Sequence, residues 1–314
     1  MVMVGSWNVE NLFSDGEFAP SSEAVYRSKI TGVAQLIRSA GVDVVGLQEI
    51  GDQQAFDDLL AELGSGWTGV LSTAPDTRGI RVAVLSRLPV SASSETVDLA
   101  ARLAPLQADD SGAVTTRMGR GALQARVELA DGPLSLVTCH LKSKLVTYPG
   151  GLFQPTDEGQ RARYAAYALY RRAAESTTVR GFADTLLDGE GRQRRLMLVG
   201  DLNDEPRAAT TQILHGPPGS ELGTAGALRP DQGDAWRLFN LAPLLPEGQR
   251  ATRVYRGRGE LIDHLLVSRA LLESVLTVAT VAAGPLPSIT EVASARQDEP
   301  TSDHAMIVTE LALN

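Results

Sequence analysis

The sequence contains one cysteine, few lysines and no long apolar run. Because Cys139 is the only cysteine among 314 residues, neither an internal disulfide nor a cysteine zinc cluster can form. No stretch reaches the about eighteen consecutive apolar residues of a membrane span, and the first residues lack a charged region followed by an apolar one. We therefore expect no stable membrane insertion, and a protein that is cytoplasmic as written or secreted if a signal has been removed.

Positive charge is scarce relative to negative charge. The chain carries 29 Lys and Arg against 38 Asp and Glu, which gives a formal net charge of −9. This balance argues against a protein whose main task is to coat nucleic acid through a basic surface, although it permits a nuclease with a local basic strip. Lysine occurs three times, and two of the lysines, Lys142 and Lys144, lie close together.

The remaining composition, 43% hydrophobic and 21% charged, is that of a globular chain with a large core. No repeat and no Pro/Ser-rich linker divides it, so we expect a single domain over residues 1–314. Apolar runs typical of strands alternate with segments of helical periodicity. The expected strands are Val2–Asn8, Val42–Gln48, Arg81–Ser86, Gly121–Leu129, Leu134–Leu141, Leu196–Gly200, Leu261–Ser268 and Ala305–Leu311. This alternation favours an α/β fold with two sheets faced by helices over a purely parallel sheet.

Polar residues recur at the ends of these strands. Carboxylate, amide and imidazole side chains lie at or next to a strand end in six segments, SWNVENLF, GLQEI, VTCHLKSK, VGDLND, LIDHLLVS and TSDHAMIV. Each segment alone has a structural explanation as a turn, a helix cap or a buried histidine. Together they indicate one rim of a common core, because so many buried polar groups without a ligand would be costly.

In this order and spacing, the six segments resemble the endonuclease/exonuclease/phosphatase superfamily. That group includes pancreatic deoxyribonuclease, the major apurinic endonucleases, neutral sphingomyelinases and inositol-polyphosphate 5-phosphatases. The resemblance runs from about Val4 to Leu311. It implies a deoxyribonuclease I-like fold, a four-layer α/β/β/α sandwich of two mostly antiparallel sheets flanked by helices, with the site at one rim.

The resemblance also implies roles for individual residues. Glu49 matches the principal carboxylate that holds a divalent metal, and Asn8 lies beside it. Glu10 and Asp303 are further metal candidates, although Glu10 departs from the pattern because many nuclease members carry Asp at that position. The catalytic candidates are His140, Asp201, Asn203, Asp263 and His304.

Phosphate ester hydrolysis requires neutralised charge and a hydroxide-like water near neutral pH. Oxygen donors with few carboxylates suit Mg²⁺ or Mn²⁺, and the histidines are not spaced as a zinc site. Two bases remain open for the attacking water. One is Asp201, with Asn203 donating to a phosphoryl oxygen, and the other is His304 with its tautomer fixed by Asp263. His140 would stabilise the transition state or protonate the leaving group of an in-line displacement.

Cationic side chains near these segments are candidates for binding substrate phosphate. Lys142 and Lys144 follow His140 at a spacing that puts all three on one strand face, although two solvated lysines are an equal alternative. Arg120 begins a strand where the family commonly places a basic or aromatic residue.

Other polar residues are interpreted as structural. We expect His264 to pack in the core and His215 to face solvent. A helix from about Glu158 carries an arginine cluster with interleaved tyrosines, which could follow a nucleic-acid strand. The overall negative charge favours a solvated helix face instead. The cluster comprises Arg161, Arg163, Arg171 and Arg172.

These residues predict a Mg²⁺-dependent phosphoric ester hydrolase, and we favour a phosphodiesterase that acts as an endo- or exonuclease on DNA or RNA. The alternative keeps the metal site but hydrolyses a phosphomonoester or a lipid, as inositol phosphatases and sphingomyelinases do, with Tyr148–Phe153 as a candidate lipid-contacting loop. A catalytically silent scaffold is disfavoured, because it would be free to lose some of the six segments. The expected partner is nucleic acid or another phosphate ester, with no obligate protein partner.

Overall fold

The computed structural model describes residues 1–314 apart from 147, 149–156, 217, 228–231, 291–292 and 314. The helices are α1 (Glu23–Ser39), α2 (Gln53–Leu63), α3 (Glu158–Leu187), α4 (Ala209–His215) and α5 (Arg269–Leu272). The strands are β1 (Val2–Leu12), β2 (Val44–Ile50), β3 (Thr68–Leu71), β4 (Arg81–Ser86), β5 (Val90–Asp98), β6 (Leu106–Gln107), β7 (Val114–Thr115), β8 (Arg117–Val127), β9 (Leu134–His140), β10 (Arg195–Asp201), β11 (Leu238–Asn240), β12 (Arg253–Tyr255), β13 (Arg258–Glu260), β14 (Asp263–Ser268), β15 (Val275–Val281), β16 (Ser288–Ile289) and β17 (Met306–Leu311).

Within these described residues, most strands form two six-stranded sheets. The first has the order β15-β17-β1-β2-β4-β3, and the second has the order β11-β14-β10-β9-β8-β5. Each sheet contains one parallel pair, β1–β2 in the first and β9–β10 in the second, and its other neighbours are antiparallel. The expectation of two mostly antiparallel sheets is confirmed.

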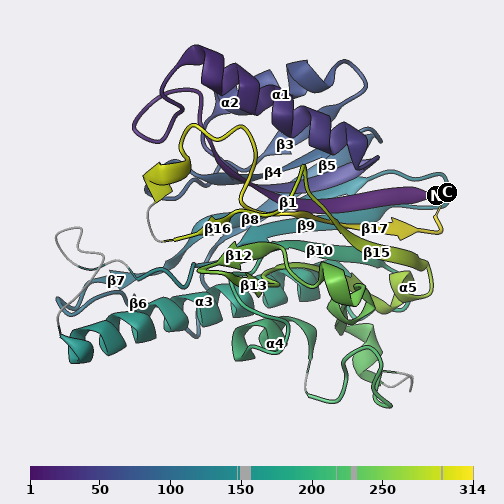
Figure 1. The fold of residues 1–314 in the computed structure, drawn as a ribbon. Helices are drawn as coiled ribbons and strands as arrows, with labels where there is room; N and C mark the ends of the chain where they lie inside the picture. The colour runs from purple at the N-terminus through teal and green to yellow at the C-terminus, as the bar shows by residue number, and fades with distance from the viewer. Residues whose placement is uncertain (147, 149–156, 217, 228–231, 291–292, 314) are drawn as a thin grey trace.

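The two sheets pack face to face and carry helices on their outer faces. Figure 1 shows α1 and α2 above the first sheet and α3 with α4 below the second. The two ends of the chain lie together at the right of this view, and Val2 pairs with Leu311 there. The four-layer deoxyribonuclease I-like sandwich is therefore confirmed. Among the described residues, no helix combines the length and the apolar character needed to cross a membrane.

Strand alternation divides the apolar residues between three layers. Val44 and Val199 point into the space between the sheets. Leu47, on the opposite face of the first sheet, belongs to the same apolar cluster as Ile30 of α1. Val137, on the outer face of the second sheet, belongs to the cluster beneath α3. Alternate residues of each strand are therefore buried in different layers. The residues that face the other sheet line the space between the sheets as far as the rim.

The sheets approach each other closely at Gly46 of β2. A Cβ atom on this residue would lie 2.6 Å from a methyl group of Val199 and 2.9 Å from Cβ of Thr138, both on the opposite sheet. Two residues further along, the Gln48 amide Nε2 donates to Thr138 Oγ1 over 2.9 Å. Glycine at position 46 thus sets the spacing between the sheets just before the strands reach the rim.

We expect Gly46→Ala to lower the free energy of unfolding by about 1–3 kcal/mol, because the added methyl overpacks the space between the sheets. Gly181→Ala is the matched control, since Gly181 lies in α3 with no atom within 4 Å of its would-be Cβ. That change should stabilise the protein by up to about 1 kcal/mol through helix propensity. Denaturant unfolding with an unchanged m value measures both. Equal stability of Gly46→Ala and wild type would contradict the close sheet spacing.

Candidate active site

The rim opposite the chain termini collects the inward-facing polar side chains of both sheets. On the second sheet, strand register pairs Asp201 with His140 on one side and with Asp263 on the other. Asn8 continues the inward face of β1, and its Nδ2 donates across the sandwich to Asp201 Oδ2 over 3.0 Å. Alternation along the strands therefore places Asp201, with its neighbours in register, opposite the amide of Asn8.

Glu49 reaches the same rim through an irregularity of its strand. Because Gln48 already faces inward, regular alternation would turn Glu49 toward the helices. The register instead shifts between Gln48 and Ile50, and Glu49 has φ +67°. Its carboxylate accepts from Asn8 Nδ2 over 3.2 Å and from the Asn11 main-chain N–H over 2.9 Å. The bulge thus aims this carboxylate into the site.

Asp201 occupies the centre of the site. Its Oδ1 accepts from the Asn203 main-chain N–H over 2.8 Å, where Asn203 has φ +53°. Its Oδ2 lies 3.5 Å from His140 Nε2 and 4.0 Å from His304 Nε2. One oxygen is therefore fixed by the turn after β10, while the other faces two imidazoles and the Asn8 amide.

His304 is oriented by a buried carboxylate. Its Nδ1 lies 2.7 Å from Asp263 Oδ2, and this contact leaves Nε2 facing Asp201. The backbone of His304 is also held, because its carbonyl accepts from Trp7 Nε1 over 2.9 Å and its N–H donates to Ser302 Oγ over 2.9 Å. The pair matches the geometry that the sequence predicted for Asp263 and His304.

Burial and neighbouring charge shift the titration of these groups. Burial, followed by the charge of Asp263, raises the pKa of Asp201 to about 7. Burial alone would lower the pKa of His304, but the charges of Asp263 and Asp303 outweigh it and raise that pKa to about 10. Burial, followed by the positive charge of Arg120, lowers the pKa of His140 well below its usual value. The two imidazoles therefore favour opposite charge states at neutral pH.

Glu49 stays ionised although it is partly buried. Desolvation would raise its pKa, but the positive charges of Arg120 and Arg78 and the N–H of Asn11 lower it overall. An ionised carboxylate among other oxygen donors is what a hard divalent cation prefers.

The donor set at the rim fits a divalent metal. Ligand atoms of Asp201, Asp263 and His304 lie within 4.8 Å of one another. Asp263 Oδ1 is buried without a hydrogen-bond partner among the described residues. Unneutralised, this concentration of buried negative charge is unfavourable, and a bound cation would relieve it.

The other metal candidates make different contacts. The Glu10 carboxylate is held by Arg296 through Nε at 2.9 Å and Nη2 at 3.0 Å, and it also accepts from the Asp303 N–H over 2.9 Å. Asn8 Oδ1 accepts from the Glu10 N–H over 3.0 Å, so its amide N–H groups face Glu49 and Asp201. In the structure, Glu10 is thus engaged in positioning the segment that contains Asp303.

The phosphate-binding candidates form two cationic walls of the rim, one at Arg120 and the other at Lys144. Arg120 Nη2 lies 2.9 Å from Asp76, and its buried Nε has no partner among the described residues. Lys144 Nζ lies 3.6 Å from Asp204 and 3.7 Å from Glu260. Lys142 donates through Nζ to the Leu145 carbonyl over 2.8 Å. Arg120 and Lys144 are therefore anchored at their carboxylate partners, whereas the Lys142 amine is bound to its own loop.

Two arginines near the site lie outside the six polar segments and were therefore not identified from the sequence. Arg78, in the loop before β4, acts on Glu49 and His140 through its charge. Arg253 begins β12, pairs in a β-bridge with His304 and donates through Nη2 to Glu260 over 2.8 Å. Its Nε is buried without a partner among the described residues. The sequence signal that could have found Arg253 is the arginine-rich run RVYRGRGE just before LIDH.

Two interpretations of polar residues as solvent-facing are wrong. His215 is 4% exposed, and its Nε2 lies 3.3 Å from the Pro206 carbonyl. Arg172 is 6% exposed, and it donates through Nε to Asp204 over 2.9 Å and through Nη1 to the Lys142 carbonyl over 3.0 Å. The physical reason is that this part of α3 packs against polar rim loops, so its arginine is buried against hydrogen-bond acceptors.

His264 is buried, as its expected packing role requires. Its Nε2 donates to the Asp204 carbonyl over 2.8 Å, and its Nδ1 accepts from Asn240 Nδ2 over 3.2 Å. Burial lowers its pKa to about 4, so the ring is neutral. Of the candidate lipid loop, Phe153 lies outside the described residues, and Tyr148 is buried against Tyr164 with ring centroids 5.3 Å apart.

Comparison with known proteins identifies the family. The solved structures that share this fold include truncated Caenorhabditis elegans TDP2, with TM-score 0.57, 16% identity and coverage of 99% of this chain and 98% of that one. A 3′-5′ exonuclease from Neisseria meningitidis has TM-score 0.55 and 20% identity, covering 99% of each chain. A mannosyl-6-phosphatase from Bacteroides thetaiotaomicron has TM-score 0.57 and 14% identity, covering 100% of each chain.

At these identities the structural likeness shows the fold alone, and no curated protein matches the chain in sequence. The sequence model of the Endonuclease/Exonuclease/phosphatase family matches residues 5–304. Because this match spans nearly the whole chain, the protein belongs to the Endonuclease/Exonuclease/phosphatase family.

Proposed function

We propose that this protein is a divalent-metal-dependent phosphodiesterase that hydrolyses nucleic acid by in-line attack of water. The observation that carries the proposal is the convergence of side chains from both sheets on Asp201. Asn8 approaches it from the first sheet, while His140 and His304 face the same oxygen. Such an arrangement combines a proton acceptor, two imidazoles and ionised oxygen donors in one buried rim.

We assign the cation to Glu49 and Asp303, as the family resemblance implies, rather than to the donor group of Asp201, Asp263 and His304, because Asp263 is already bound to His304 Nδ1. When bound, Mg²⁺ or Mn²⁺ supplies positive charge that neutralises phosphate and favours the hydroxide form of water. We assign Glu10 a positioning role, because its carboxylate is already shared between Arg296 and the N–H of Asp303.

The chain's own residues would handle the proton and the negative charge. We assign Asp201 Oδ2 to orient and deprotonate the attacking water, since Oδ1 is fixed by Asn203 and Oδ2 faces the site. His304, whose Nδ1 is bound to Asp263, presents Nε2 toward the phosphoryl oxygens that gain charge in the transition state. His140 lies on the other side of Asp201, and because its lowered pKa keeps the ring neutral, we assign it to stabilise the transition state by hydrogen bonding to a phosphoryl oxygen.

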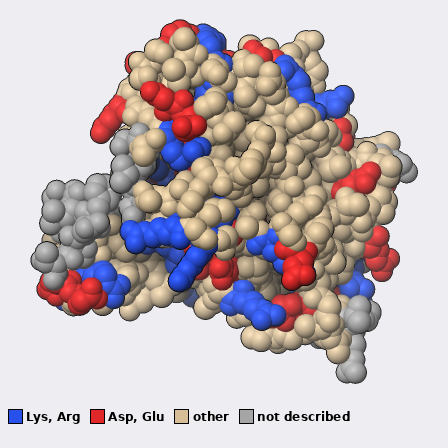
Figure 2. Space-filling model, viewed as in Figure 1, with Lys and Arg blue, Asp and Glu red and all other residues tan. Residues whose placement is uncertain are grey.

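Two anchored cationic walls support a substrate with several phosphates. Arg120 and Asp76 form one ion pair, and Arg253 and Glu260 form another, with Lys144 also beside Glu260. Each arginine keeps a buried N–H without a partner among the described residues. Figure 2 shows Lys and Arg side chains gathered left of centre, over the region of β12 and β13 in Figure 1, on a protein of net charge −9. A local basic strip of this kind suits a nucleic-acid backbone.

A panel assay tests the proposed function. Single-stranded DNA, duplex DNA, RNA, an inositol polyphosphate, sphingomyelin and bis-p-nitrophenyl phosphate are each incubated with Mg²⁺ or Mn²⁺. We expect cleavage of at least one nucleic acid and of bis-p-nitrophenyl phosphate, and loss of both with a chelator that removes the cation. Activity confined to the inositol polyphosphate or to sphingomyelin would overturn the nucleic-acid assignment.

Removing a central side chain should abolish most turnover. We expect Glu49→Gln and His304→Gln each to lower kcat by at least about a hundredfold, the effect of losing an electrostatic or acid–base group. His215→Gln is the matched control, because His215 is also a buried histidine but bonds to the Pro206 carbonyl of another segment. Its kcat should stay within about threefold of wild type. Near-normal turnover of both central variants would refute their assigned roles.

Arg253 should contribute to substrate binding through phosphate. Burial alone would lower its pKa, but Glu260, Asp201 and Asp303 raise it, so the guanidinium remains charged beside the site. We expect Arg253→Met to raise KM for an oligonucleotide roughly tenfold, since a hydrogen bond to a charged group contributes about 1.5–3 kcal/mol. The slope of log(kcat/KM) against log salt should also fall by about 1. The control is Arg126→Met, whose arginine pairs with Glu128 at the far end of β8. Identical effects of the two variants would contradict a specific role.

A further inference from the structure

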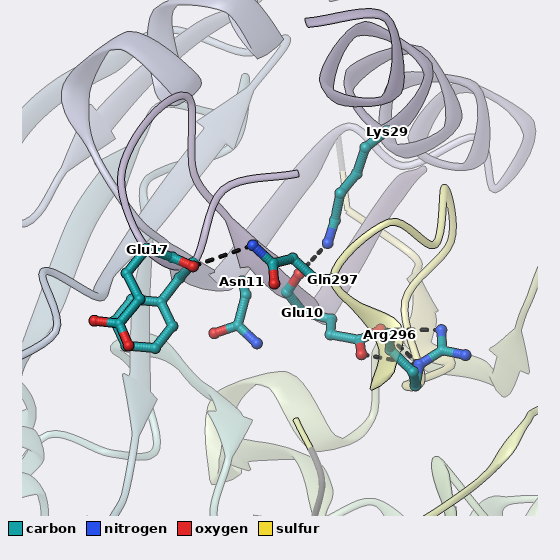
Figure 3. Close-up of a pocket in the computed structure, with 7 residues that line it drawn as sticks. Glu10, Asn11, Glu17, Lys29, Arg296 and Gln297 are labelled. Carbon is teal, nitrogen blue, oxygen red and sulfur yellow. Dashed lines mark hydrogen bonds and ion pairs between the residues drawn. The ribbon is translucent and has the colours of Figure 1, made fainter. Parts of the chain in front are cut away.

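A cavity of about 220 Å³ adjoins the catalytic rim and is not used by the chemistry described above (Figure 3). One side is formed by the end of β1 and the loop after it, including Asn11 and Phe18. The other side is formed by Lys29 of α1 and by Arg296 with Gln297. The volume lies below the roughly 300 Å³ at which pockets for drug-sized ligands begin, so it suits a single ring system.

The cavity shares a wall with the metal candidates. The main-chain N–H of Asn11 donates to Glu49 Oε2 over 2.9 Å, while the next residue back, Glu10, accepts from the Asp303 N–H over 2.9 Å. A group seated in the cavity would therefore lie immediately beside a phosphate held at Glu49. This position is that of a nucleotide flanking the bond to be cleaved.

The side chain of Asn11 is an unused amide in this cavity. Figure 3 shows it between Glu17 on one side and Glu10 with Arg296 on the other. Its Oδ1 is buried without a hydrogen-bond partner among the described residues, which is unfavourable. Glu10 and Asn11 also have φ +53° and +48°, an unfavourable conformation for two consecutive non-glycine residues. A ligand that hydrogen-bonds to the amide would offset both the unpartnered oxygen and the unfavourable backbone conformation.

An aromatic ring forms part of the same cavity. Phe18 lines it, with the Phe13 ring 5.7 Å away at a tilted angle and the guanidinium of Arg78 5.5 Å from its centroid. These contacts fix the ring in place. A fixed ring next to a free amide can combine stacking with a pair of hydrogen bonds.

The two cationic side chains that line the cavity are both engaged by Glu10. Lys29 Nζ donates to the Glu10 carbonyl, and Arg296 holds the Glu10 carboxylate. Gln297 donates to the carbonyls of Glu17 and Ala19, and the Glu17 side chain is exposed at this edge. With both lining cations engaged by Glu10, the cavity suits a neutral planar group that both donates and accepts hydrogen bonds.

We propose that this cavity binds a nucleobase of the strand being cleaved, stacked against Phe18 and hydrogen-bonded by the Asn11 amide. Asparagine pairs with the adjacent donor and acceptor of a base edge through its own acceptor and donor. The proposal rests on the proposed function, because it requires a nucleic-acid substrate. It adds that the enzyme senses the base next to the scissile phosphate.

A cycle of enzyme and substrate changes tests the base site. Short single-stranded oligonucleotides with one cleavable linkage are made abasic at one position at a time, and kcat/KM is measured with wild type, Asn11→Gly and Phe18→Leu. Glycine accepts φ +48° and retains the N–H that donates to Glu49, while leucine keeps apolar volume without the ring face. Base removal further along the strand is the matched control.

With wild type, we expect base removal at one position flanking the cut to lower kcat/KM by at least about tenfold, in line with the contribution of a stacked base. With Asn11→Gly or Phe18→Leu, the same removal should cost less than about threefold. Equal costs of base removal in all three proteins, or no cost in wild type, would overturn the base site while leaving the nuclease intact. A wild type that cleaves bis-p-nitrophenyl phosphate but no oligonucleotide would overturn the nucleic-acid substrate and the base site together.

Discussion

Burial of the Asp201 carboxylate between the two sheets is the constraint on which the site depends. This side chain is 2% exposed and is flanked in register by His140 and Asp263. Desolvation and a second carboxylate in the next strand both disfavour its charge. Donors compensate from two directions, namely Asn8 on the opposite sheet and the main chain of Asn203. Asn8, one of the two groups that make the buried carboxylate tolerable, thus also links the two sheets at the rim.

Departures from regular strand geometry bring into the site the side chains that strand alternation alone would point away from it. Glu49 reaches the site through a bulge with positive φ, and Glu10, Asn11 and Asn203 adopt the same backbone region. Each such residue costs on the order of 1–3 kcal/mol and persists when its surroundings leave no alternative. The tight contact of Gly46 with the opposite sheet lies three residues before Glu49, so the strand has little freedom to slip into a regular register.

The sequence predicted the layers and the convergence of His140, Asp201, Asp263 and His304 because strand alternation and the family resemblance act on the same positions. It could not predict the surroundings that depend on packing between distant segments. Arg253 lies in a short strand whose bridge to His304 is formed only in the folded chain. Arg172 was assigned to a solvated helix face because helical periodicity cannot reveal that the layer beneath is polar. The contact of Glu10 with Arg296 likewise joins segments 286 residues apart.

The long helix α3 explains how the Arg120 side of the site keeps its spacing from the centre. Its buried Glu175 accepts from the main-chain N–H of Gly119 over 2.8 Å and from that of Lys142 over 2.6 Å. These contacts fix the start of β8, which contains Arg120, to the chain just beyond β9. Arg172, one turn earlier, binds the turn that follows Asp201 through the Asp204 carboxylate. A buried charge network of this kind is satisfied only when all its partners are present. The helix therefore ties one phosphate-binding wall and the central carboxylate to the same rigid element.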